Sequence, residues 1–176
     1  MRRAVFLDRD GVLNRAIVLN GLPYPPQNLT ELEILPGVSQ ALTALRQAGF
    51  LLIVVTNQPD VKRGTVSKLT VDSMNNYLFS HLCLDQVRTC YHDNNDACMC
   101  RKPLPGMLFE AAKDFDIDLS NSFIVGDRWR DVEAGERAGC QTFFIDYGYF
   151  EAKPNNPNYT VSSLLEAQQI ILGECI

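Results

Sequence analysis

The sequence predicts an α/β fold with a doubly wound, mainly parallel sheet, and three features support this. Short apolar runs recur along the chain and end at polar residues, which is typical of strands buried on both faces of a sheet. Helical patterns of apolar residues separate these runs, and strand–helix alternation indicates βαβ units. The 176 residues, 46% of them hydrophobic, suffice for one domain with a sizeable core. We therefore expect a single domain over residues 1–176.

The apolar runs correspond to five expected strands. They are AVFL at 4–7, FLLIVV at 50–55, QVRTCY at 86–91, SFIV at 122–125 and TFFI at 142–145. Helices are expected where apolar residues repeat at helical spacing, over 38–48, 69–84, 107–115, 130–138 and 161–172. The first helix follows Pro36-Gly37 and is closed by Gly49. Residues 153–159 are expected to form a surface loop before the last helix.

Charge and hydropathy argue against a nucleic-acid-binding, secreted or membrane protein. A net charge of -5 and a pI of about 5.0 argue against binding a nucleic-acid backbone, which normally requires a basic surface. The first apolar run ends at Leu7 and Asp8 follows, too early for a signal peptide. The longest apolar run, at 50–55, is far short of a membrane span. We expect a cytoplasmic protein with neither nucleic acid nor a membrane as a partner.

Three polar residues stand at the ends of expected strands. Asp8 follows the first strand, Thr56 follows the second, and Asp127 comes after Gly126 at the end of the fourth. In open α/β sheets, ligands bind at the edge where the carboxyl ends of the strands lie. We therefore expect these three side chains, from distant parts of the chain, to converge on one crevice.

These residues are suited to phosphate chemistry with a metal ion. The segment DRDGVLN places carboxylates at Asp8 and Asp10, and residues two apart on an extended segment point the same way. Two like charges this close favour a shared cation or a raised pKa on one of them. With Asp127 as a third carboxylate, the set suits Mg²⁺, which prefers few hard oxygen ligands and open positions. A carboxylate can attack phosphorus, while Lys102 adds positive charge and Thr56 a hydroxyl donor.

Each of these residues alone has an ordinary structural explanation. An Asp after a strand is usually a turn former or a helix cap, and Thr56-Asn57-Gln58 fits the start of a helix. Lys102 alone fits a solvated surface lysine. The combination, in this order and mostly at strand ends, is what favours a site. The sequence contains no Walker A segment, so a P-loop nucleotide binder is not expected.

A second cluster lies in the segment CYHDNNDACMC. Cys90, His92, Cys98 and Cys100 offer one imidazole and three thiolates, which suits tetrahedral Zn²⁺ with no open position. Unrelated free cysteines and disulfides are the alternatives, and the expected compartment disfavours disulfides. We therefore expect a structural zinc loop at residues 90–100. The remaining cysteines are expected to be ordinary thiols: Cys83, Cys140 and Cys175.

As a set, DRDGVLN, VVTNQ, CRKP and IVGDRWRD resemble the four motifs of the haloacid-dehalogenase phosphatase superfamily. The resemblance implies that Asp8 is the nucleophile. It implies that Asp10 is the general acid toward the leaving group and then the base for water. Thr56 and Lys102 would bind the phosphoryl group. Mg²⁺ would be held by the side chains of Asp8 and Asp127 and the backbone carbonyl of Asp10.

The spacing of the motifs leaves little room for a cap domain, which many relatives in this superfamily insert. The stretch 14–36 has room only for a loop or a short hairpin, and 58–100 holds one helix, one strand and the cysteine cluster. The chain thus resembles a capless member, in which short loops around an open crevice select the substrate. Asp131 is the weakest of the motif residues, because it could equally cap or solvate the helix that follows.

The predicted zinc loop indicates which branch of the superfamily the chain resembles. It is similar to that of the D-glycero-D-manno-heptose 1,7-bisphosphate 7-phosphatases and of the related histidinol-phosphate phosphatases. Its short middle resembles the histidinol branch and some heptose enzymes, whereas Arg63-Gly64 matches the heptose branch. Pro59-Asp60 departs from the Ser-Gly usual there, and Arg63 could also be an ordinary surface charge. The expected substrate-binding residues are Asn57, Gln58, Arg63, Arg101 and Lys102.

The resemblance implies a Mg²⁺-dependent phosphomonoester hydrolase that forms an aspartyl phosphate, and we expect this protein to be a monomer. A small phosphorylated sugar would be its partner, and the C7 phosphate of a heptose 1,7-bisphosphate is the expected target. Histidinol phosphate is the alternative substrate, and a DNA 3′-phosphatase is disfavoured by the acidic charge. A zinc-stapled, non-catalytic interaction module is a further alternative. It is disfavoured by the presence of the whole motif set: Asp8, Asp10, Lys102 and Asp127.

Overall fold

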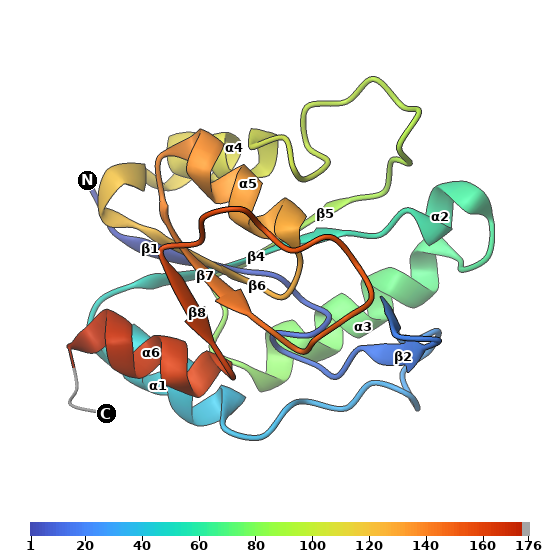
Figure 1. Ribbon diagram of the computed structural model, residues 1–176, viewed down its shortest axis with the longest axis horizontal. Helices are drawn as coiled ribbons and strands as arrows, with labels where there is room; N and C mark the ends of the chain where they lie inside the picture. The colour runs from blue at the N-terminus through green and yellow to red at the C-terminus, as the bar shows by residue number, and fades with distance from the viewer. Residues whose placement is uncertain (174–176) are drawn as a thin grey trace.

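The computed structural model describes residues 1–173, which form a parallel sheet between two layers of helices (Figure 1). The strands of this sheet are β1 (Ala4–Leu7), β4 (Leu51–Asn57), β5 (Gln86–Cys90), β6 (Phe123–Gly126), β7 (Gln141–Ile145) and β8 (Tyr159–Val161). The helices are α1 (Val38–Gln47), α2 (Asp60–Arg63), α3 (Lys68–His81), α4 (Gly106–Phe115), α5 (Trp129–Ala138) and α6 (Leu164–Leu172). A 3₁₀ turn, η1, spans Leu119–Asn121, and a separate hairpin consists of β2 (Ile17–Leu19) and β3 (Leu22–Tyr24).

The order of the strands places a switch point at the centre of the sheet. The six strands lie in the order β5-β4-β1-β6-β7-β8, and every neighbouring pair is parallel. The chain runs outward from β1 to β4 and β5, returns to the other side of β1 as β6, and continues to β7 and β8. Because the direction of winding reverses between β1 and β6, a crevice opens there at the carboxyl ends of the strands.

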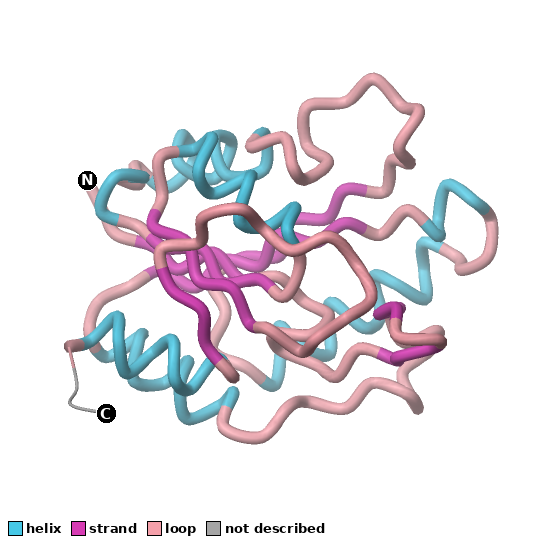
Figure 2. The backbone as a smooth tube through the Cα atoms, viewed as in Figure 1, coloured by secondary structure: helices cyan, strands magenta, loops and turns pink. Residues whose placement is uncertain are grey.

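Alternation along the strands builds two hydrophobic cores, one on each face of the sheet. Val5 and Leu7 of β1 belong to the core that α1, α3 and α6 cover, while Ala4 and Phe6 belong to the core under α4. All four side chains are fully buried. The same division continues in the neighbouring strands, which explains their unbroken apolar runs. Figure 2 shows the helices separated into two layers by the strands.

The predicted fold class is confirmed, and all five predicted strands are present with ends within two residues of those expected. The predicted helices are also present, and the stretch 14–36 contains the β2–β3 hairpin. Two expectations were wrong at the carboxyl end. Tyr159–Val161 forms a sixth strand, which pairs with β7, and the last helix begins at Leu164 rather than at residue 161. A three-residue edge strand is too short to show a pattern of its own.

Local signals explain where several helices begin and end. The Oγ atoms of Ser67 and Ser163 accept backbone hydrogen bonds at the starts of α3 and α6. The four-residue helix α2 was not expected, because it is too short to carry a periodic pattern. Within residues 1–173, none of the helices has the length and apolar character needed to cross a membrane. The prediction for Cys175 lies outside the described residues.

Candidate active site

The predicted convergence of strand ends is seen in the structure. Asp8 follows β1, Thr56 lies near the end of β4, and Asp127 follows β6, and all three line one cavity of about 230 Å³. Its other lining residues come from the β2–β3 hairpin, the start of α2, the loop after β5 and the start of α5. They include Asp10, Tyr24, Asn57, Asp60, Arg63, Asn94, Arg101, Lys102, Arg128, Arg130 and Asp131.

Asp8 is a buried carboxylate beside a buried cation. Its Oδ1 atom lies 2.9 Å from Nζ of Lys102 and accepts a hydrogen bond of 2.8 Å from the backbone N–H of Arg9. Burial raises the pKa of Asp8 to about 6, and the charge of Asp131 adds to this, while Lys102 acts in the opposite direction. One Asp8 oxygen is thus held by fixed donors, in a position where the carboxylate can face the cavity.

Lys102 bridges two carboxylates and one carbonyl. Its Nζ atom lies 2.5 Å from Oδ1 of Asp131 and donates to the carbonyl oxygen of Val55 at 2.6 Å, in addition to its contact with Asp8. Burial alone would lower the pKa of this lysine, but the adjacent carboxylates of Asp131 and Asp8 raise it above its usual value. Lys102 therefore carries a fixed positive charge between the ends of β1, β4 and α5, where phosphate oxygens could approach.

Asp131, the weakest of the predicted motif residues, has two distinct contacts. Its Oδ2 atom accepts a hydrogen bond from the backbone N–H of Arg128 at 3.1 Å, which satisfies the start of α5. Its Oδ1 atom contacts Lys102. The helix cap and the lysine contact are therefore made by the same carboxylate. A Cβ atom at Gly126 would lie 2.1 Å from Cβ of Asp131, so glycine allows this close approach of α5 to β6.

Asp127 is buried without a hydrogen-bond partner. Neither of its carboxylate oxygens accepts a well-formed hydrogen bond within the described residues, although the Tyr149 hydroxyl approaches and partly lowers its pKa. Burial, followed by the charges of Asp8 and Asp131, raises the pKa of Asp127 well above its usual value. Gly11 has φ +87°, and a Cβ there would lie 1.9 Å from Oδ2 of Asp127.

Oxygen atoms of Asp8, Asp127 and Asp131 lie within 4.8 Å of one another. Three buried carboxylates at this separation repel each other, and a divalent cation would relieve that repulsion and satisfy Asp127. Hard oxygen donors of this kind fit Mg²⁺. The residues present therefore suit the magnesium ion expected from the sequence, with Asp8 and Asp127 as the available side-chain ligands.

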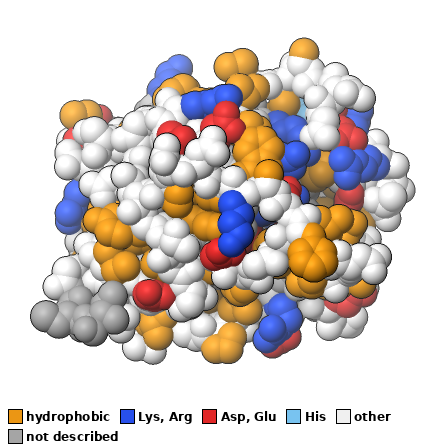
Figure 3. Space-filling model, viewed as in Figure 1, with side chains coloured by type: hydrophobic (Ala, Val, Ile, Leu, Met, Phe, Trp, Pro, Cys, Tyr) orange, Lys and Arg blue, Asp and Glu red, His pale blue; other side chains and the backbone are white. Residues whose placement is uncertain are grey.

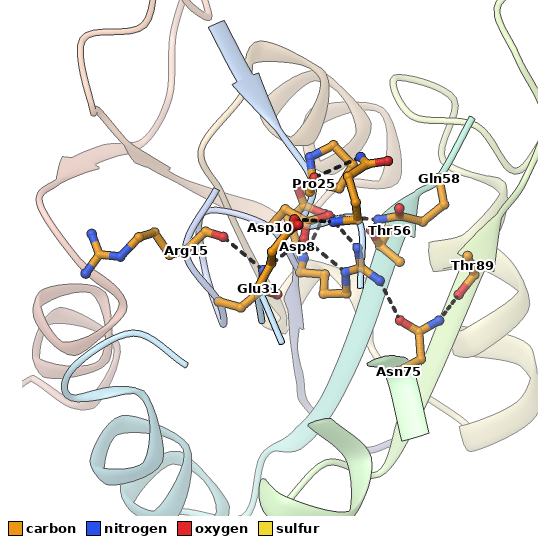
Figure 4. Close-up of polar contacts among 12 residues, drawn as sticks. Asp8, Asp10, Arg15, Pro25, Glu31, Thr56, Gln58, Asn75 and Thr89 are labelled. Atoms are coloured by element: carbon orange, nitrogen blue, oxygen red, sulfur yellow. Dashed lines mark hydrogen bonds and ion pairs between the residues drawn. The ribbon is translucent and has the colours of Figure 1, made fainter. Parts of the chain in front are cut away.

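Asp10 faces the same cavity but is held differently (Figure 4). Its Oδ1 atom accepts from Nε of Arg9 at 3.1 Å and from Nδ2 of Asn14 at 2.9 Å. Its Oδ2 atom accepts from Nη2 of Arg9 at 3.0 Å and from Nε2 of Gln58 at 2.8 Å. The same Gln58 amide also donates to Oγ1 of Thr56 at 3.0 Å. Asp10 is therefore fixed in orientation by three neighbours.

The structure separates the predicted substrate-binding residues into two groups. Asn57 lines the cavity, but its amide group pairs with the backbone N–H and carbonyl of Lys102, at 3.1 and 3.0 Å. Gln58 is buried below the cavity and contacts Asp10 and Thr56 instead. Arg63 and Arg101 lie at the cavity mouth. Two further arginines there, Arg128 and Arg130, were not singled out from the sequence.

The four arginines differ in how their charge is balanced. Arg63 makes a bidentate contact with Asp93, and Arg128 pairs with Glu151. Arg101 donates to neutral oxygens of Asn94 and His92, and Arg130 lies over the ring of Trp129. Neither of these last two is within ion-pair distance of a carboxylate in residues 1–173. Figure 3 shows Lys and Arg side chains gathered at the upper right, near α2 and the loop after β5.

The predicted zinc ligands also meet. The Sγ atom of Cys100 lies 3.1 Å from Sγ of Cys90 and 3.3 Å from Nδ1 of His92, and the Sγ atoms of Cys90 and Cys98 are 3.9 Å apart. Ligands about 2.3 Å from a tetrahedral zinc ion lie roughly 3.8 Å from each other. Cys83, Cys90, Cys98, Cys100 and Cys140 are all free thiols. The donor set and its spacing therefore fit zinc better than a disulfide.

Comparisons with known proteins agree with this geometry. Residues 99–167 match the HAD-hydrolase-like family model. A D-glycero-β-D-manno-heptose-1,7-bisphosphate 7-phosphatase from Bordetella bronchiseptica is 34% identical over 151 residues, 83% of this chain and 82% of the relative. The chain belongs to the heptose-1,7-bisphosphate 7-phosphatase family of haloacid-dehalogenase-like hydrolases. The enzyme of that name from Pasteurella multocida is 32% identical over 98% of both chains.

A solved structure of this family has the same fold. The crystal structure of D,D-heptose 1,7-bisphosphate phosphatase from B. bronchiseptica, complexed with magnesium and phosphate, superposes with a TM-score of 0.80. Its sequence is 29% identical, and the match covers 98% of this chain and 99% of the other. The family and the sheet topology therefore agree with the phosphatase class that the motif set predicts.

Proposed function

We propose that this protein is a Mg²⁺-dependent phosphatase that removes the C7 phosphate of D-glycero-D-manno-heptose 1,7-bisphosphate. The observation that carries the proposal is the contact between Asp8 and Lys102 beside the unpartnered carboxylate of Asp127, at the carboxyl edge of the sheet. This places a nucleophile, a fixed positive charge and a cation site in one cavity. The names of the relatives support the heptose bisphosphate as the substrate.

In the proposed first step, an oxygen of Asp8 attacks the phosphorus of the C7 phosphate. The Asp8–phosphorus bond forms as the bond to the C7 oxygen breaks, and protonated Asp10 gives its proton to that leaving oxygen. Lys102 and the hydroxyl of Thr56 stabilise the charge on the transferring phosphoryl group. A magnesium ion held by the side chains of Asp8 and Asp127 and the carbonyl of Asp10 would supply further positive charge there.

In the proposed second step, water attacks the phosphorus of the aspartyl phosphate. The carboxylate of Asp10 takes a proton from this water, the bond to Asp8 breaks, and inorganic phosphate leaves. Asp10 ends the cycle protonated and Asp8 ends it as a free carboxylate, as both began. Asp10 lines the cavity together with Asp8, as both proton transfers require.

The charge at the cavity mouth favours a bisphosphate over histidinol phosphate. Four arginines line the mouth, and Arg101 and Arg130 have no carboxylate partner in the described part of the chain. The charge of Arg130 also helps lower the pKa of Arg101, after the larger effect of burial, so the two guanidinium groups repel each other. A second phosphate would relieve this repulsion, because guanidinium groups bind phosphate oxygens well. The ammonium group of histidinol would add to the repulsion.

We also propose that Cys90, His92, Cys98 and Cys100 hold a structural zinc ion. The loop 90–100 then serves the single domain as a rigid support for the cavity. Arg101 follows the last of these ligands and donates to the carbonyl oxygen of His92 at 3.1 Å, so a fixed loop would fix this guanidinium too. The free thiols are consistent with a reducing, cytoplasmic setting and with a monomer that needs no disulfide.

The test is a phosphate-release assay with heptose 1,7-bisphosphate, as either anomer, and with histidinol phosphate. The bisphosphate should be the better substrate by kcat/KM, phosphate release should stop in EDTA, and added Mg²⁺ should restore it. An Asp8→Asn variant should be inactive while retaining its fold and bound zinc. A preference for histidinol phosphate would overturn the substrate, and full activity of Asp8→Asn would overturn the mechanism and favour a non-catalytic scaffold.

A further inference from the structure

Arg9 is the largest side chain that is fully buried within the described residues, with 0% of its surface exposed. It stands between Asp8 and Asp10, where the sequence alone suggests an ordinary solvated arginine. It does not line the cavity, whereas both neighbouring aspartates do. A buried guanidinium is costly unless it is paired, because it cannot lose its proton in a protein.

The guanidinium of Arg9 donates two parallel hydrogen bonds to the carboxylate of Asp10. Its Nε and Nη2 atoms lie 3.1 and 3.0 Å from the two oxygens of this carboxylate. A bidentate, charge-assisted contact of this kind fixes the plane of a carboxylate as well as its position. The other two donors to Asp10 are the neutral amides of Asn14 and Gln58. The four donors fill the usual acceptor sites of a carboxylate.

Asp10 must carry a proton to give to the leaving oxygen, and a protonated carboxyl accepts fewer hydrogen bonds than a carboxylate, so one of the four donors must give up its contact. The amides of Asn14 and Gln58 are the weaker donors, since hydrogen bonds between an ion pair are stronger than those from a neutral group. Gln58 also donates to Thr56, which lines the cavity, so the Gln58 amide connects Asp10 to a cavity-lining side chain. Arg9 contacts Asp10 from the protein interior. Its two hydrogen bonds to Asp10 can therefore remain when the hydrogen bond from Gln58 is broken.

Arg9 is itself anchored by a second layer of polar contacts (Figure 4). Its Nη1 atom donates to Oδ1 of Asn75 on α3 at 3.0 Å. The Nδ2 atom of Asn75 donates in turn to Oγ1 of Thr89 on β5, also at 3.0 Å. Asn75 is 6% exposed, and this row of contacts connects the edge strand of the sheet with Asp10. Each member of the row restricts the orientation of the next.

We propose that Arg9 is a positioning residue for catalysis, which holds the Asp10 carboxylate in the orientation needed for proton transfer, and that Asn75 and Thr89 fix Arg9 in turn. The inference rests on the role of Asp10 in the proposed function. Arg9 acts only through Asp10, because it does not line the cavity where substrate binds. Its loss should therefore affect proton transfer to the leaving group and not substrate binding.

The choice of leaving group separates a positioning role from a structural one. A sugar alkoxide needs a proton from Asp10, whereas 2,4-dinitrophenolate leaves without one. Arg9→Met and Asn75→Leu should lower kcat on the heptose bisphosphate at least about tenfold, a part of the usual general-acid contribution, with KM little changed. The first-turnover burst of dinitrophenolate from 2,4-dinitrophenyl phosphate should stay within about threefold of wild type.

Thr89 provides a matched pair in case the larger changes impair folding. Thr89→Ser keeps the hydroxyl that Asn75 contacts and should keep kcat, whereas the isosteric Thr89→Val should lower it selectively for the sugar phosphate. Thr142→Val is the control, because Thr142 is likewise a strand threonine bonded to an asparagine, Asn158, at 3.1 Å between the Oγ1 of Thr142 and the Oδ1 of Asn158. It lies on β7, and it should leave kcat unchanged.

Asp10→Asn serves as the reference variant. If it keeps full kcat on the sugar phosphate, the role of Asp10 in the proposed function is wrong and the inference about Arg9 is wrong with it. If Asp10→Asn loses kcat but Arg9→Met, Asn75→Leu and Thr89→Val do not, the proposed function stands and only the inference is overturned. Equal losses on both substrates would also overturn it, because they would indicate a general structural effect.

Discussion

The Nζ atom of Lys102 lies 2.9 Å from Oδ1 of Asp8, although the two residues come from the first and third motifs and are far apart in the sequence. The sheet brings them together. Asp8 follows β1, and Lys102 is held over the neighbouring β4 by the carbonyl of Val55 and the side chain of Asn57. Lys102 thereby compensates the charges of Asp8, the proposed nucleophile, and of Asp131 at once. The charge balance of the carboxylate cluster, Asp8, Asp127 and Asp131, depends on this ammonium group.

We expect Lys102→Met to lose both activity and stability. Removal of the charge leaves Asp8 and Asp131 buried without their cation, which usually costs about 3–5 kcal/mol of unfolding free energy. Loss of a donor to the transferring phosphoryl group should lower kcat by about 10²-fold or more. Thermal unfolding and steady-state kinetics measure the two effects. The isolated surface variant Lys153→Met should change neither, since Lys153 is exposed and Asp146 is its one ion-pair partner in residues 1–173. Wild-type activity in Lys102→Met would contradict the proposed role.

Magnesium should stabilise the protein more as the pH rises. Asp8 has a pKa raised to about 6, and that of Asp127 is raised as well, whereas an unfolded aspartate titrates near roughly 3.9. Between about pH 4 and pH 6 the folded protein therefore binds more protons than the unfolded chain, so its unfolding free energy falls as the pH rises. Mg²⁺ bound to the ionised carboxylates would reverse this loss.

The measurement is the increase in Tm caused by Mg²⁺ at about pH 5 and about pH 7.5, and the increase should be larger at the higher pH. Asp127→Asn should abolish the Mg²⁺ response and raise the Tm of the metal-free protein at neutral pH. Asp116→Asn is the matched control, because this exposed aspartate lies at the other end of the sheet beside Met1. A response independent of pH would show that these carboxylates are not the ligands.

Removing a zinc ligand should weaken the loop without removing the nucleophile. Cys98→Ser should lose bound zinc, lower the Tm, and raise KM for the bisphosphate, because Arg101 relies on the zinc loop for its position. Cys83→Ser is the matched control, a half-buried free thiol outside the cluster. Metal analysis after dialysis should give about one zinc per wild-type chain. A zinc-free Cys98→Ser protein with full stability and unchanged KM would show that the loop needs no metal.

Much of the fold and of the catalytic cluster could be predicted because each signal is local. The apolar run of β4 ends at Thr56 and that of β6 at Gly126, so the positions of the polar residues follow from strand ends and parallel topology. The predicted zinc ligands lie within one short segment. β8 could not be predicted, because its three residues owe their strand conformation to pairing with β7.

Arg9 and the arginines of α5 could not be predicted for a different reason. Arginine is usually solvated, and nothing in the sequence around Arg9 indicates that α3 and β5 will bury it. Arg128 and Arg130 lie within the fourth motif, but their place beside the cavity depends on how the start of α5 is positioned after β6. Such side chains are identified only by tertiary contacts.

The arginines at the cavity mouth should recognise the phosphate that is not removed. Arg101→Met and Arg130→Met should each raise KM for heptose 1,7-bisphosphate by about tenfold or more, since a hydrogen bond between charged groups contributes about 1.5–3 kcal/mol. The same variants should change KM for heptose 7-phosphate by less than about threefold, because this substrate lacks the second phosphate.

Arg46→Met is the matched control for this pair, because Arg46 is exposed and, in the described part of the chain, its guanidinium makes polar contacts with Cys83 and Asp85 alone, at the other end of the sheet. It should leave KM for both substrates unchanged. In each arginine variant kcat should be retained, since Asp8, Asp10 and Lys102 are untouched. A rise in KM of equal size for both heptose phosphates would place the two guanidinium groups at the C7 phosphate instead. An unchanged KM for the bisphosphate would remove the charge argument for that substrate altogether.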